Sequence, residues 1–242
     1  HRTRIKKQIY GNILDIKKFN KALNYCKPDI IIYLAAQALV IAGYKDPLNT
    51  FMTNNNGLIN FFEILRNQKK NNLSKVIVFT SDKVYKNLDK KNSYSENDPL
   101  GGSDPYSASK ACQEIICESY YKSFFLKKFS LINIRAGNII GGGDWSKNRI
   151  IPDIIYSIFK NKSLYIRNLN YTRPWQHVLD VCNIVDVIIK KYNKKNFNKY
   201  NIGPNVKNKT VNDILQKFRV TYKKNKSSNY KEKKLLNLNS NK

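Results

Sequence analysis

Histidine and cysteine, which most often bind transition metals in proteins, are scarce in this sequence. The chain has two histidines, His1 and His177, and four cysteines. The cysteines do not have the short spacing that is typical of zinc ligands: Cys26, Cys112, Cys117 and Cys182. We therefore expect no metal site, and we interpret the cysteines as buried free thiols in a reducing compartment.

Long apolar runs are lacking as well. The most apolar segments, residues 29–41 and 75–80, are too short to span a bilayer, and each ends at polar residues. Residues 1–15 are basic, but the apolar stretch of a secretory signal does not follow them. These features predict a cytoplasmic protein without a membrane partner.

Acidic residues are few, since 17 Asp and Glu stand against 44 Lys and Arg, with a formal net charge of +27. Such an excess is typical of nucleic-acid-binding proteins. Here, however, lysine is mixed with asparagine along the whole chain, and no nucleic-acid-binding motif is found. We interpret the charge as solvated surface and expect no nucleic-acid partner. A basic RNA-binding module is a remote alternative, which a steep salt dependence of RNA affinity would support.

Strand-like apolar segments alternate with helical patterns, which predicts an α/β fold with a parallel sheet. Hydrophobic residues make up 41% of the chain, which is enough for a sizeable core. The expected strands, each buried in the sheet, are residues 29–36, 75–80 and 129–135. The expected helices are residues 47–67 and 104–125, with Pro105 in the first turn of the second.

The pattern changes near residue 145, after a glycine-rich turn. Shorter helical patterns and brief strand-like pieces follow, which predicts a smaller mixed lobe over residues 146–242. Its expected helices are residues 151–159, 178–190 and 211–218, and its expected strands are residues 164–167 and 200–202. Residues 222–234 are rich in Lys, Asn and Ser, which predicts a loop.

Tyr106 and Lys110 are four residues apart, so they share one face of the second long helix. An ammonium group beside a phenol favours the phenolate and lowers a phenol pKa that is about 10 when unperturbed. The pair would then act as a general base on an alcohol whose carbon loses hydride. This spacing also arises by chance between two surface residues of a helix.

A polar cluster, Thr80-Ser81-Asp82-Lys83, follows the second expected strand directly. Ligands of open parallel sheets bind at the carboxyl ends of the strands. A hydroxyl, an acid and an amine at this point therefore predict a site, although a polar strand-to-loop turn is the plainer alternative.

Six motifs in order resemble the extended short-chain dehydrogenase/reductases that act on nucleotide sugars, and among them most closely the CDP-glucose 4,6-dehydratases. The motifs are LAAQ, TSDKVY, PYSASK, RAGNIIGGGDW, NRIIPD and TRPWQHVLD. The resemblance runs from Gly11 to Lys242 and implies a Rossmann-like fold. It also implies an NAD-binding domain over residues 1–145 and a mainly substrate-binding lobe after it, interleaved with the sheet.

The resemblance implies catalytic roles for five residues. Tyr106 matches the catalytic tyrosine, and Lys110 matches the lysine that also holds the nicotinamide ribose. Ser81 matches the hydroxyl that hydrogen-bonds the sugar, and Asp82 matches the acid that protonates the departing C6 hydroxyl. Lys83 lies where the related dTDP-glucose dehydratases have a glutamate base for the C5 proton. A lysine serves as that base only when it is neutral, and whether Lys83 abstracts the proton or orients water stays open.

Further residues match the binding positions of the family. Those that match the dinucleotide-lining positions are Leu34, Ala35, Ala36, Gln37, Asn54 and Thr80, with Tyr106 and Lys110. Those that match the substrate-contacting positions are Asn138, Arg149, Arg167 and Arg173. The implied reaction converts CDP-glucose to CDP-4-dehydro-6-deoxyglucose, with NAD as the hydride carrier, by C4 oxidation, loss of water from C5 and C6, and hydride return to C6.

The sequence departs from the family pattern at its start. The glycine-rich turn that binds the dinucleotide pyrophosphate is absent, and residues 11–15 resemble the stretch after the third strand of relatives. We therefore expect a fragment without the first two strands and without the final helices, which by itself binds NAD poorly and is inactive. Tyr33 also stands where relatives usually have a histidine.

Other functions of the same fold stay open from the sequence. They are a dTDP- or GDP-sugar 4,6-dehydratase, a 4-epimerase, and a non-catalytic binding protein or pseudoenzyme. An epimerase does not need the acid and amine beside Ser81, so Asp82 and Lys83 favour a dehydratase. Relatives often dimerise through the helix that carries Tyr106, and a homodimer through this helix is an open expectation.

Overall fold

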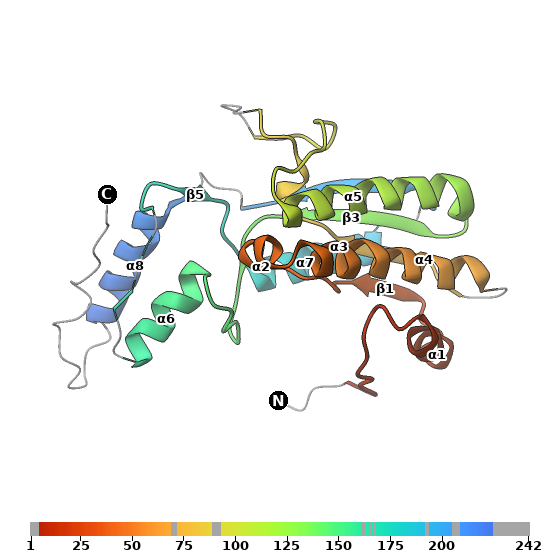
Figure 1. The fold of residues 1–242 in the computed structure, drawn as a ribbon, viewed down its shortest axis with the longest axis horizontal. Helices are drawn as coiled ribbons and strands as arrows, with labels where there is room; N and C mark the ends of the chain where they lie inside the picture. Colours follow the sequence, from red (N-terminus) through yellow and green to blue (C-terminus); the bar gives the residue numbers. More distant parts are fainter. Residues whose placement is uncertain are drawn as a thin grey trace. The chain divides into compact units, whose positions relative to one another are not determined.

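The computed structural model describes residues 5–68, 72–88, 93–160, 163–164, 166, 168–191, 194–204 and 209–224 (Figure 1). The chain divides into two compact units. The first unit comprises His1–Ala136 and Val187–Ile202, and the second comprises Gly137–Asp186 and Gly203–Lys242. The division thus falls nine residues before the boundary predicted at residue 145, and the first unit includes a late segment of the chain.

A four-stranded parallel sheet forms the centre of the first unit. Its strands are β1 (Ile30–Tyr33), β2 (Lys75–Phe79), β3 (Ser130–Ala136) and β7 (Phe197–Ile202), in the order β1-β2-β3-β7. Every residue of β3 is buried, as expected of a central strand in a parallel sheet. The predicted parallel α/β architecture is therefore confirmed.

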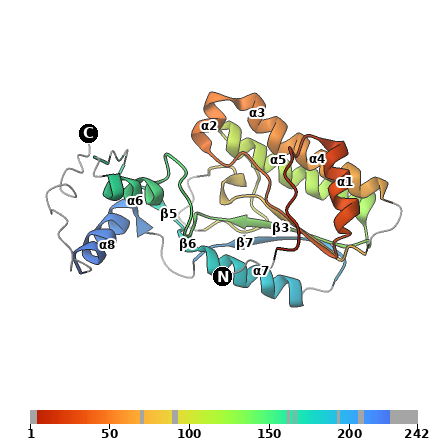
Figure 2. The same ribbon diagram turned by 90° about the horizontal axis from the view of Figure 1, so that it is seen from below.

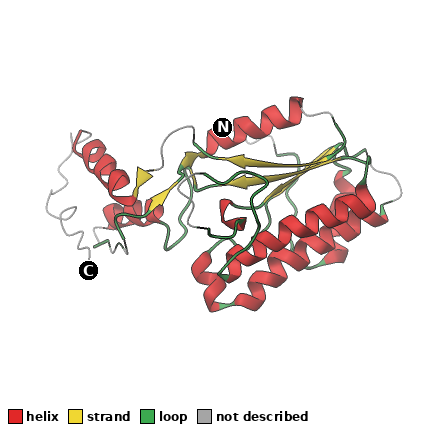
Figure 3. Ribbon diagram, turned by 90° about the horizontal axis from the view of Figure 1, so that it is seen from above, coloured by secondary structure: helices red, strands yellow, loops and turns green. Residues whose placement is uncertain are grey.

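Helices cover one side of this sheet, as Figures 2 and 3 show. They are α1 (Ile16–Cys26), α2 (Val40–Lys45), α3 (Pro47–Phe51), α4 (Gly57–Asn67) and α5 (Pro105–Tyr120). The π-helical segment η1 (Met52–Asn56) joins α3 to α4, and η3 (Tyr121–Phe125) continues α5. The two long predicted helices are thus confirmed, each with an i→i+5 stretch that periodicity does not reveal.

The helix starts have local causes. Asp104 caps α5, because its carboxylate accepts a hydrogen bond from the Ser107 backbone N–H, and Pro105 occupies the first turn. Asp46 and Pro47 begin α3 in the same way. These caps fix the residues at which α3 and α5 begin.

The core of the first unit is rich in aromatic residues from α4, from η3 and from the position just before β3. Phe61, Phe62, Phe125 and Phe129 are all nearly or fully buried there, and Phe62 packs edge-on against Phe125. Leu58 on α4 belongs to the same cluster and is fully buried. Burial of these large side chains is the main apolar contribution to the stability of the unit.

Strand β1 lies at one edge of the sheet and pairs only with β2 among the described residues. This edge position is the one predicted for a strand without its inner neighbours. The prediction that it is buried on both faces is wrong, because Ile32 is 43% exposed and Leu34, just after the strand, is 64% exposed. An edge strand leaves one row of backbone groups without a sheet partner.

The second unit contains short elements around a small core. Its helices are α6 (Ile150–Lys160), α8 (Val211–Lys224) and the first part of α7 (Val178–Lys191). Its strands form the pairs β4 (Ile139–Ile140) with β6 (Gln176–His177) and β5 (Thr172–Arg173) with β8 (Lys209–Thr210). The three predicted helices are all present. Helices α6 and α8 contribute to the buried core, which is formed by Ile154, Ile166, Val211 and Leu215.

Several local predictions are wrong. Residues 200–202 belong to β7 of the parallel sheet rather than to the second lobe, because β7 pairs with β3. Leu164 and Ile166 lie in no strand, and Arg167 lies outside the described residues. Helix α8 reaches Lys224, so residues 222–224 are helical rather than part of the expected loop, and residues 225–234 lie outside the described residues.

The cysteines are free, but only Cys117 is buried. Cys26, Cys112 and Cys182 are exposed, so the prediction of buried thiols is wrong for these three. All three lie on helices with one buried and one exposed face, and the residue type alone does not show on which face a cysteine lies. None of the helices in the described ranges is long and apolar enough to cross a membrane.

A matched pair of leucines tests the packing of the first unit. We expect Leu58→Ala to lower the free energy of unfolding by about 2–5 kcal/mol, because a fully buried leucine leaves a cavity when it is truncated. Leu48→Ala should lower it by less than about 0.5 kcal/mol, since Leu48 is 72% exposed. Urea unfolding of the purified protein measures both changes. Equal losses in the two variants would contradict the described core.

Candidate active site

The polar cluster predicted at the second strand lies at the carboxyl end of β2. The Thr80 backbone N–H donates to the Ile134 carbonyl at 2.9 Å and so extends the β2–β3 ladder by one residue. The chain then turns into a short 3₁₀ helix, η2 (Asp82–Val84). The cluster is therefore held at the edge where ligands of parallel sheets bind.

Ser81 organises the start of this turn. Its hydroxyl accepts a hydrogen bond from the Lys83 backbone N–H at 3.2 Å and donates to the Asp82 carboxylate at 3.1 Å. Ser81 is buried, whereas Asp82 and Lys83 are half-buried. The two charged side chains are thus partly accessible to solvent beside a hydroxyl whose orientation is fixed.

Lys110 reaches the same strand end from α5. Its ammonium donates to the Phe79 carbonyl and to Gln113 Oε1, both at 3.0 Å. Burial lowers the pKa of Lys110 to about 8, and the nearby acidic groups Cys117 and Glu114 act in the opposite direction. A buried ammonium thus contacts the backbone carbonyl two residues before Ser81.

Tyr106 lies one turn before Lys110 on α5 and is half-buried. Helix α5 packs against η2, so the elements that carry Tyr106 and Asp82 are neighbours. We expect the Ser81 hydroxyl to lie close to the Tyr106 phenol. The Tyr106 backbone itself has little space, because a Cβ added at Gly43 of α2 would lie 3.3 Å from its N atom.

The residues after β1 are tied to η1 and α5 by side-chain amides. The Gln37 backbone N–H donates to Asn54 Oδ1 at 2.7 Å, and Asn54 Nδ2 donates to the Gln37 carbonyl and to Ser109 Oγ. Gln37 Nε2 also donates to Thr50 Oγ1 at 2.9 Å. The structure thus brings Gln37 and Asn54 together, as their shared predicted role requires.

The remaining residues predicted for the dinucleotide flank this arrangement. Leu34 is largely exposed, Ala35 and Ala36 are half-buried, and Thr80 is buried. Thr80 hydrogen-bonds the Glu114 carboxylate through its hydroxyl. All of these positions follow β1 or β2, whose carboxyl ends share one edge because the strands are parallel. Their role in binding a cofactor stays a prediction.

The predicted substrate contacts belong to the second unit and make local contacts there. The Asn138 carbonyl accepts from the Gln176 N–H at 2.9 Å. A guanidinium nitrogen of Arg149 lies 4.0 Å from the Asp144 carboxylate. Arg173 donates to the Thr172 carbonyl and lies over the Tyr171 ring. Arg167 lies outside the described residues, and the roles of all four stay predictions.

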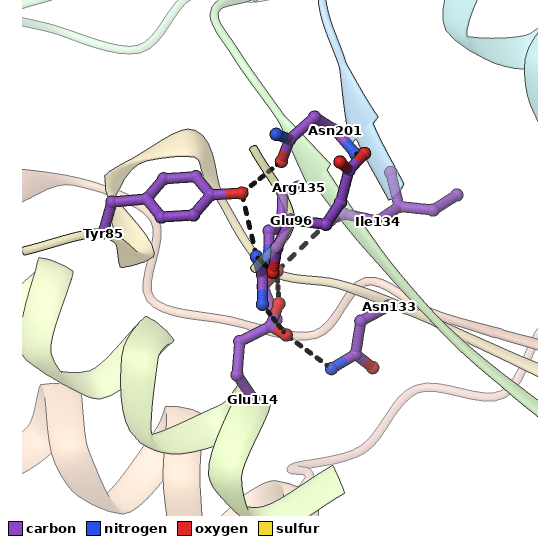
Figure 4. A network of polar contacts seen from close by, with 8 residues as sticks. Tyr85, Glu96, Glu114, Asn133, Ile134, Arg135 and Asn201 are labelled. Atoms are coloured by element: carbon purple, nitrogen blue, oxygen red, sulfur yellow. Dashed lines mark hydrogen bonds and ion pairs between the residues drawn. The ribbon is translucent and has the colours of Figure 1, made fainter. Parts of the chain in front are cut away.

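A buried polar network beside Lys110 was not predicted from the sequence. Figure 4 shows its principal members, Tyr85, Glu96, Glu114, Arg135 and Asn201, together with Asn133. Glu114 lies four residues after Lys110, on the face of α5 that already carries the predicted pair. Asn133 and Arg135 alternate with apolar residues in β3. Polar side chains at every second position of a buried strand were the signal that could have revealed the network.

The buried ammonium of Lys110 predicts a pH dependence of stability. Between pH 8 and 10.5 the unfolded chain retains a proton on Lys110 that the folded protein has lost, so the free energy of unfolding should rise with pH through this window. The slope from this group is at most about 1.4 kcal/mol per pH unit. Urea unfolding at pH 7.5 and 9.5, without added ligand, should show this rise.

The matched variants are Lys110→Met, which should lose that part of the pH dependence, and Lys45→Met, which should keep it. Lys45 is an exposed lysine of α2. If wild-type protein and Lys110→Met respond equally to pH, Lys110 is not buried as described.

Comparison with known proteins supplies the family. The sequence matches the GDP-mannose 4,6 dehydratase family over residues 1–241. It is 38% identical over 217 residues to the CDP-glucose 4,6-dehydratase of Salmonella typhimurium, with 86% of this chain and 60% of that protein covered. It is 34% identical over 204 residues to the dTDP-D-glucose 4,6-dehydratase of Dictyostelium discoideum, with 80% of this chain and 45% of that protein covered.

Solved structures agree on the fold. The crystal structure of dTDP-glucose 4,6-dehydratase from Bacillus anthracis in complex with NAD has a TM-score of 0.73 and 25% identity, and the match covers 90% of this chain and 64% of that one. UDP-glucuronic acid 4-epimerase from Bacillus cereus, in complex with UDP-glucuronic acid and NAD, has a TM-score of 0.77 at 21% identity, and the match covers 89% of this chain and 65% of that one. The predicted Rossmann-like fold is therefore confirmed.

The chain spans about 60% of the length of its Salmonella relative. Its sequence match over residues 1–241 and its fold together place this chain in the GDP-mannose 4,6 dehydratase family, which confirms the predicted relation to nucleotide-sugar 4,6-dehydratases.

Proposed function

We propose that the full-length protein is an NAD-dependent dehydratase that converts CDP-glucose to CDP-4-dehydro-6-deoxyglucose. The observation that carries this proposal is the junction at the end of β2, where the buried Lys110 ammonium contacts the Phe79 carbonyl just before Ser81, Asp82 and Lys83. The 38% identity to a CDP-glucose 4,6-dehydratase supports the choice of nucleotide.

The residues at this edge suit a nicotinamide dinucleotide. Leu34, Ala35 and Ala36 offer small or apolar surface after β1, and the amides of Gln37 and Asn54 hold that loop in place. The Lys110 ammonium has three N–H donors, and two of them bind the Phe79 carbonyl and Gln113, so one remains for a ribose hydroxyl. When bound, NAD supplies the acceptor, and later the donor, of the hydride.

Tyr106 is the base for the C4 hydroxyl in this proposal. Lys110, one helical turn away, favours the phenolate because its pKa of about 8 keeps it largely cationic at neutral pH. Its burial strengthens that electrostatic effect, since water screens a buried charge poorly.

Ser81, Asp82 and Lys83 serve the later steps. Ser81 hydrogen-bonds the sugar, and its bond to Asp82 orients the carboxyl group that protonates the departing C6 hydroxyl. Lys83, half-buried beside them, removes the C5 proton or orients the water that does so. Arg149, Arg167 and Arg173 bind the diphosphate, because guanidinium groups pair bidentately with phosphate oxygens.

A change at the phenol tests the oxidation step. We expect Tyr106→Phe in the full-length protein to abolish C4 oxidation of CDP-glucose, because the phenylalanine ring has no group that accepts the hydroxyl proton. Nicotinamide absorbance in a single turnover measures this step. Tyr44→Phe is the matched control, since Tyr44 is an exposed tyrosine of α2, and it should keep wild-type activity. If Tyr106→Phe oxidises C4 at the wild-type rate, Tyr106 is not the base.

A change at the acid tests the elimination step separately. We expect Asp82→Asn to oxidise C4 but to lose water about 10²- to 10⁴-fold more slowly, since an amide does not supply the proton that the C6 hydroxyl needs. Reduced nicotinamide should therefore accumulate, and C5 hydrogen exchange with solvent should persist if Lys83 reaches C5.

The matched control is Asp29→Asn, at an exposed aspartate before β1, which should turn over normally. Full dehydration by Asp82→Asn would exclude Asp82 as the acid. A 4-epimerised product from the wild-type protein would instead favour a 4-epimerase, whose reaction needs no such acid. Assays with dTDP- and GDP-glucose beside CDP-glucose determine the nucleotide.

A further inference from the structure

Glu114 and Arg135 form an ion pair in the interior of the first unit. Glu114 Oε2 lies 2.9 Å from Arg135 Nη2, and both side chains are only 1% exposed. Removing two charges from water is unfavourable, and apolar residues of similar size would often be at least as stable. The other contacts of the two residues show what the pair holds together.

The Glu114 carboxylate holds the residue that precedes the Ser81 cluster. The Thr80 hydroxyl donates to Oε1, and Asn133 Nδ2 donates to Oε2 at 3.0 Å. Glu114 lies on α5 one turn after Lys110, and it thereby connects this helix to the end of β2 and to the middle of β3. The start of the 81–83 segment is attached to the helix that carries Tyr106.

The Arg135 guanidinium holds the residue two positions after Lys83. Its Nη1 donates to the Tyr85 hydroxyl at 2.8 Å and to the Glu96 carbonyl at 3.0 Å, and the guanidinium lies 5.0 Å from the centre of the Tyr85 ring. The Tyr85 hydroxyl donates in turn to Asn201 Oδ1 of β7 (Figure 4). The Tyr85 ring also stacks on Tyr94. The far end of the segment is thus fixed as well.

We propose that Glu114 and Arg135 are positioning residues that clamp both ends of the segment 81–83 to the helix carrying Tyr106 and Lys110. This inference rests on the proposed function, in which Ser81, Asp82 and Lys83 act on the same sugar as Tyr106. The clamp sets the distance between groups that come from different elements, and a displacement of about 1 Å in such a site costs on the order of 100-fold in rate. The ion pair itself touches neither sugar nor cofactor.

The test uses a variant that removes both charges. Glu114→Gln with Arg135→Met avoids the lone buried charge that either single change leaves behind. Tyr85→Phe is a second, milder variant that removes only the hydroxyl at the Arg135 end of the clamp. Glu118→Gln with Lys122→Met is the matched control, since this pair lies at the end of the same helical stretch and is exposed.

In the full-length protein, we expect the double variant to lower kcat for CDP-glucose by about 10- to 100-fold while KM changes little, because binding groups outside the segment are intact. Tyr85→Phe should lower kcat by a smaller factor in the same direction. Amide hydrogen exchange should show lost protection over residues 80–86, with β2 and β3 unchanged. The control variant should match the wild type in both measurements.

Native kcat in Tyr85→Phe and in the folded double variant overturns the clamp, and so does unchanged exchange over residues 80–86. If the double variant does not fold, Tyr85→Phe decides by the same two measurements. An inactive wild-type protein on every nucleotide-glucose substrate would refute the proposed function alone, because the exchange measurement on residues 80–86 needs no substrate.

Discussion

Helix α5 is held against the sheet and against η1 by buried polar contacts, and the candidate site depends on them. Lys110 donates to the Phe79 carbonyl, Gln113 donates to the Asn54 carbonyl, and Glu114 is paired with Arg135. Hydrogen bonds are directional, so they fix the rotation and the axial position of a helix more narrowly than apolar packing does. The helix that carries Tyr106 is therefore placed against β2 and β3 by hydrogen bonds and an ion pair as well as by apolar packing.

The acidic residues of this basic chain occupy structurally decisive positions. Asp15, Asp46 and Asp104 begin α1, α3 and α5 as N-caps. Glu114 accepts three hydrogen bonds in the interior, from Thr80, Asn133 and Arg135. With only 17 acidic side chains against 44 basic ones, the fold uses acids where a backbone N–H or a buried cation needs an acceptor.

The fold is shared by enzymes with different reactions, so the chemistry must reside in the site. Both a dTDP-glucose 4,6-dehydratase and a UDP-glucuronic acid 4-epimerase superpose on this chain with TM-scores above 0.7. The residues that favour a dehydratase are the acid and the amine that follow Ser81, at the carboxyl end of β2. In the proposed function, a short turn on a common scaffold therefore sets the reaction type.

Much of the scaffold was predictable because its signals are local. The buried strands at residues 75–80 and 129–135 and the long helices follow from apolar periodicity, capping aspartates and proline at the helix start. Tyr106 and Lys110 were predictable because helical geometry alone places residues four apart on one face. The motifs also sufficed to predict the family and the candidate residues.

Contacts between distant segments were decided only by the tertiary structure. Three features depend on which elements become neighbours: the edge exposure of β1, the membership of residues 197–202 in the parallel sheet, and the exposure of Cys112. The Glu114–Arg135 pair joins positions 21 residues apart, and Tyr85 meets Asn201 across 116 residues. The polar residues of β3 indicate that buried partners are needed, but the identity of those partners has no local signal, because it results from the packing of a helix and a loop onto particular strands. The sequence by itself thus determined most of the elements and the candidate residues, and the fold determined which contacts hold those residues in place.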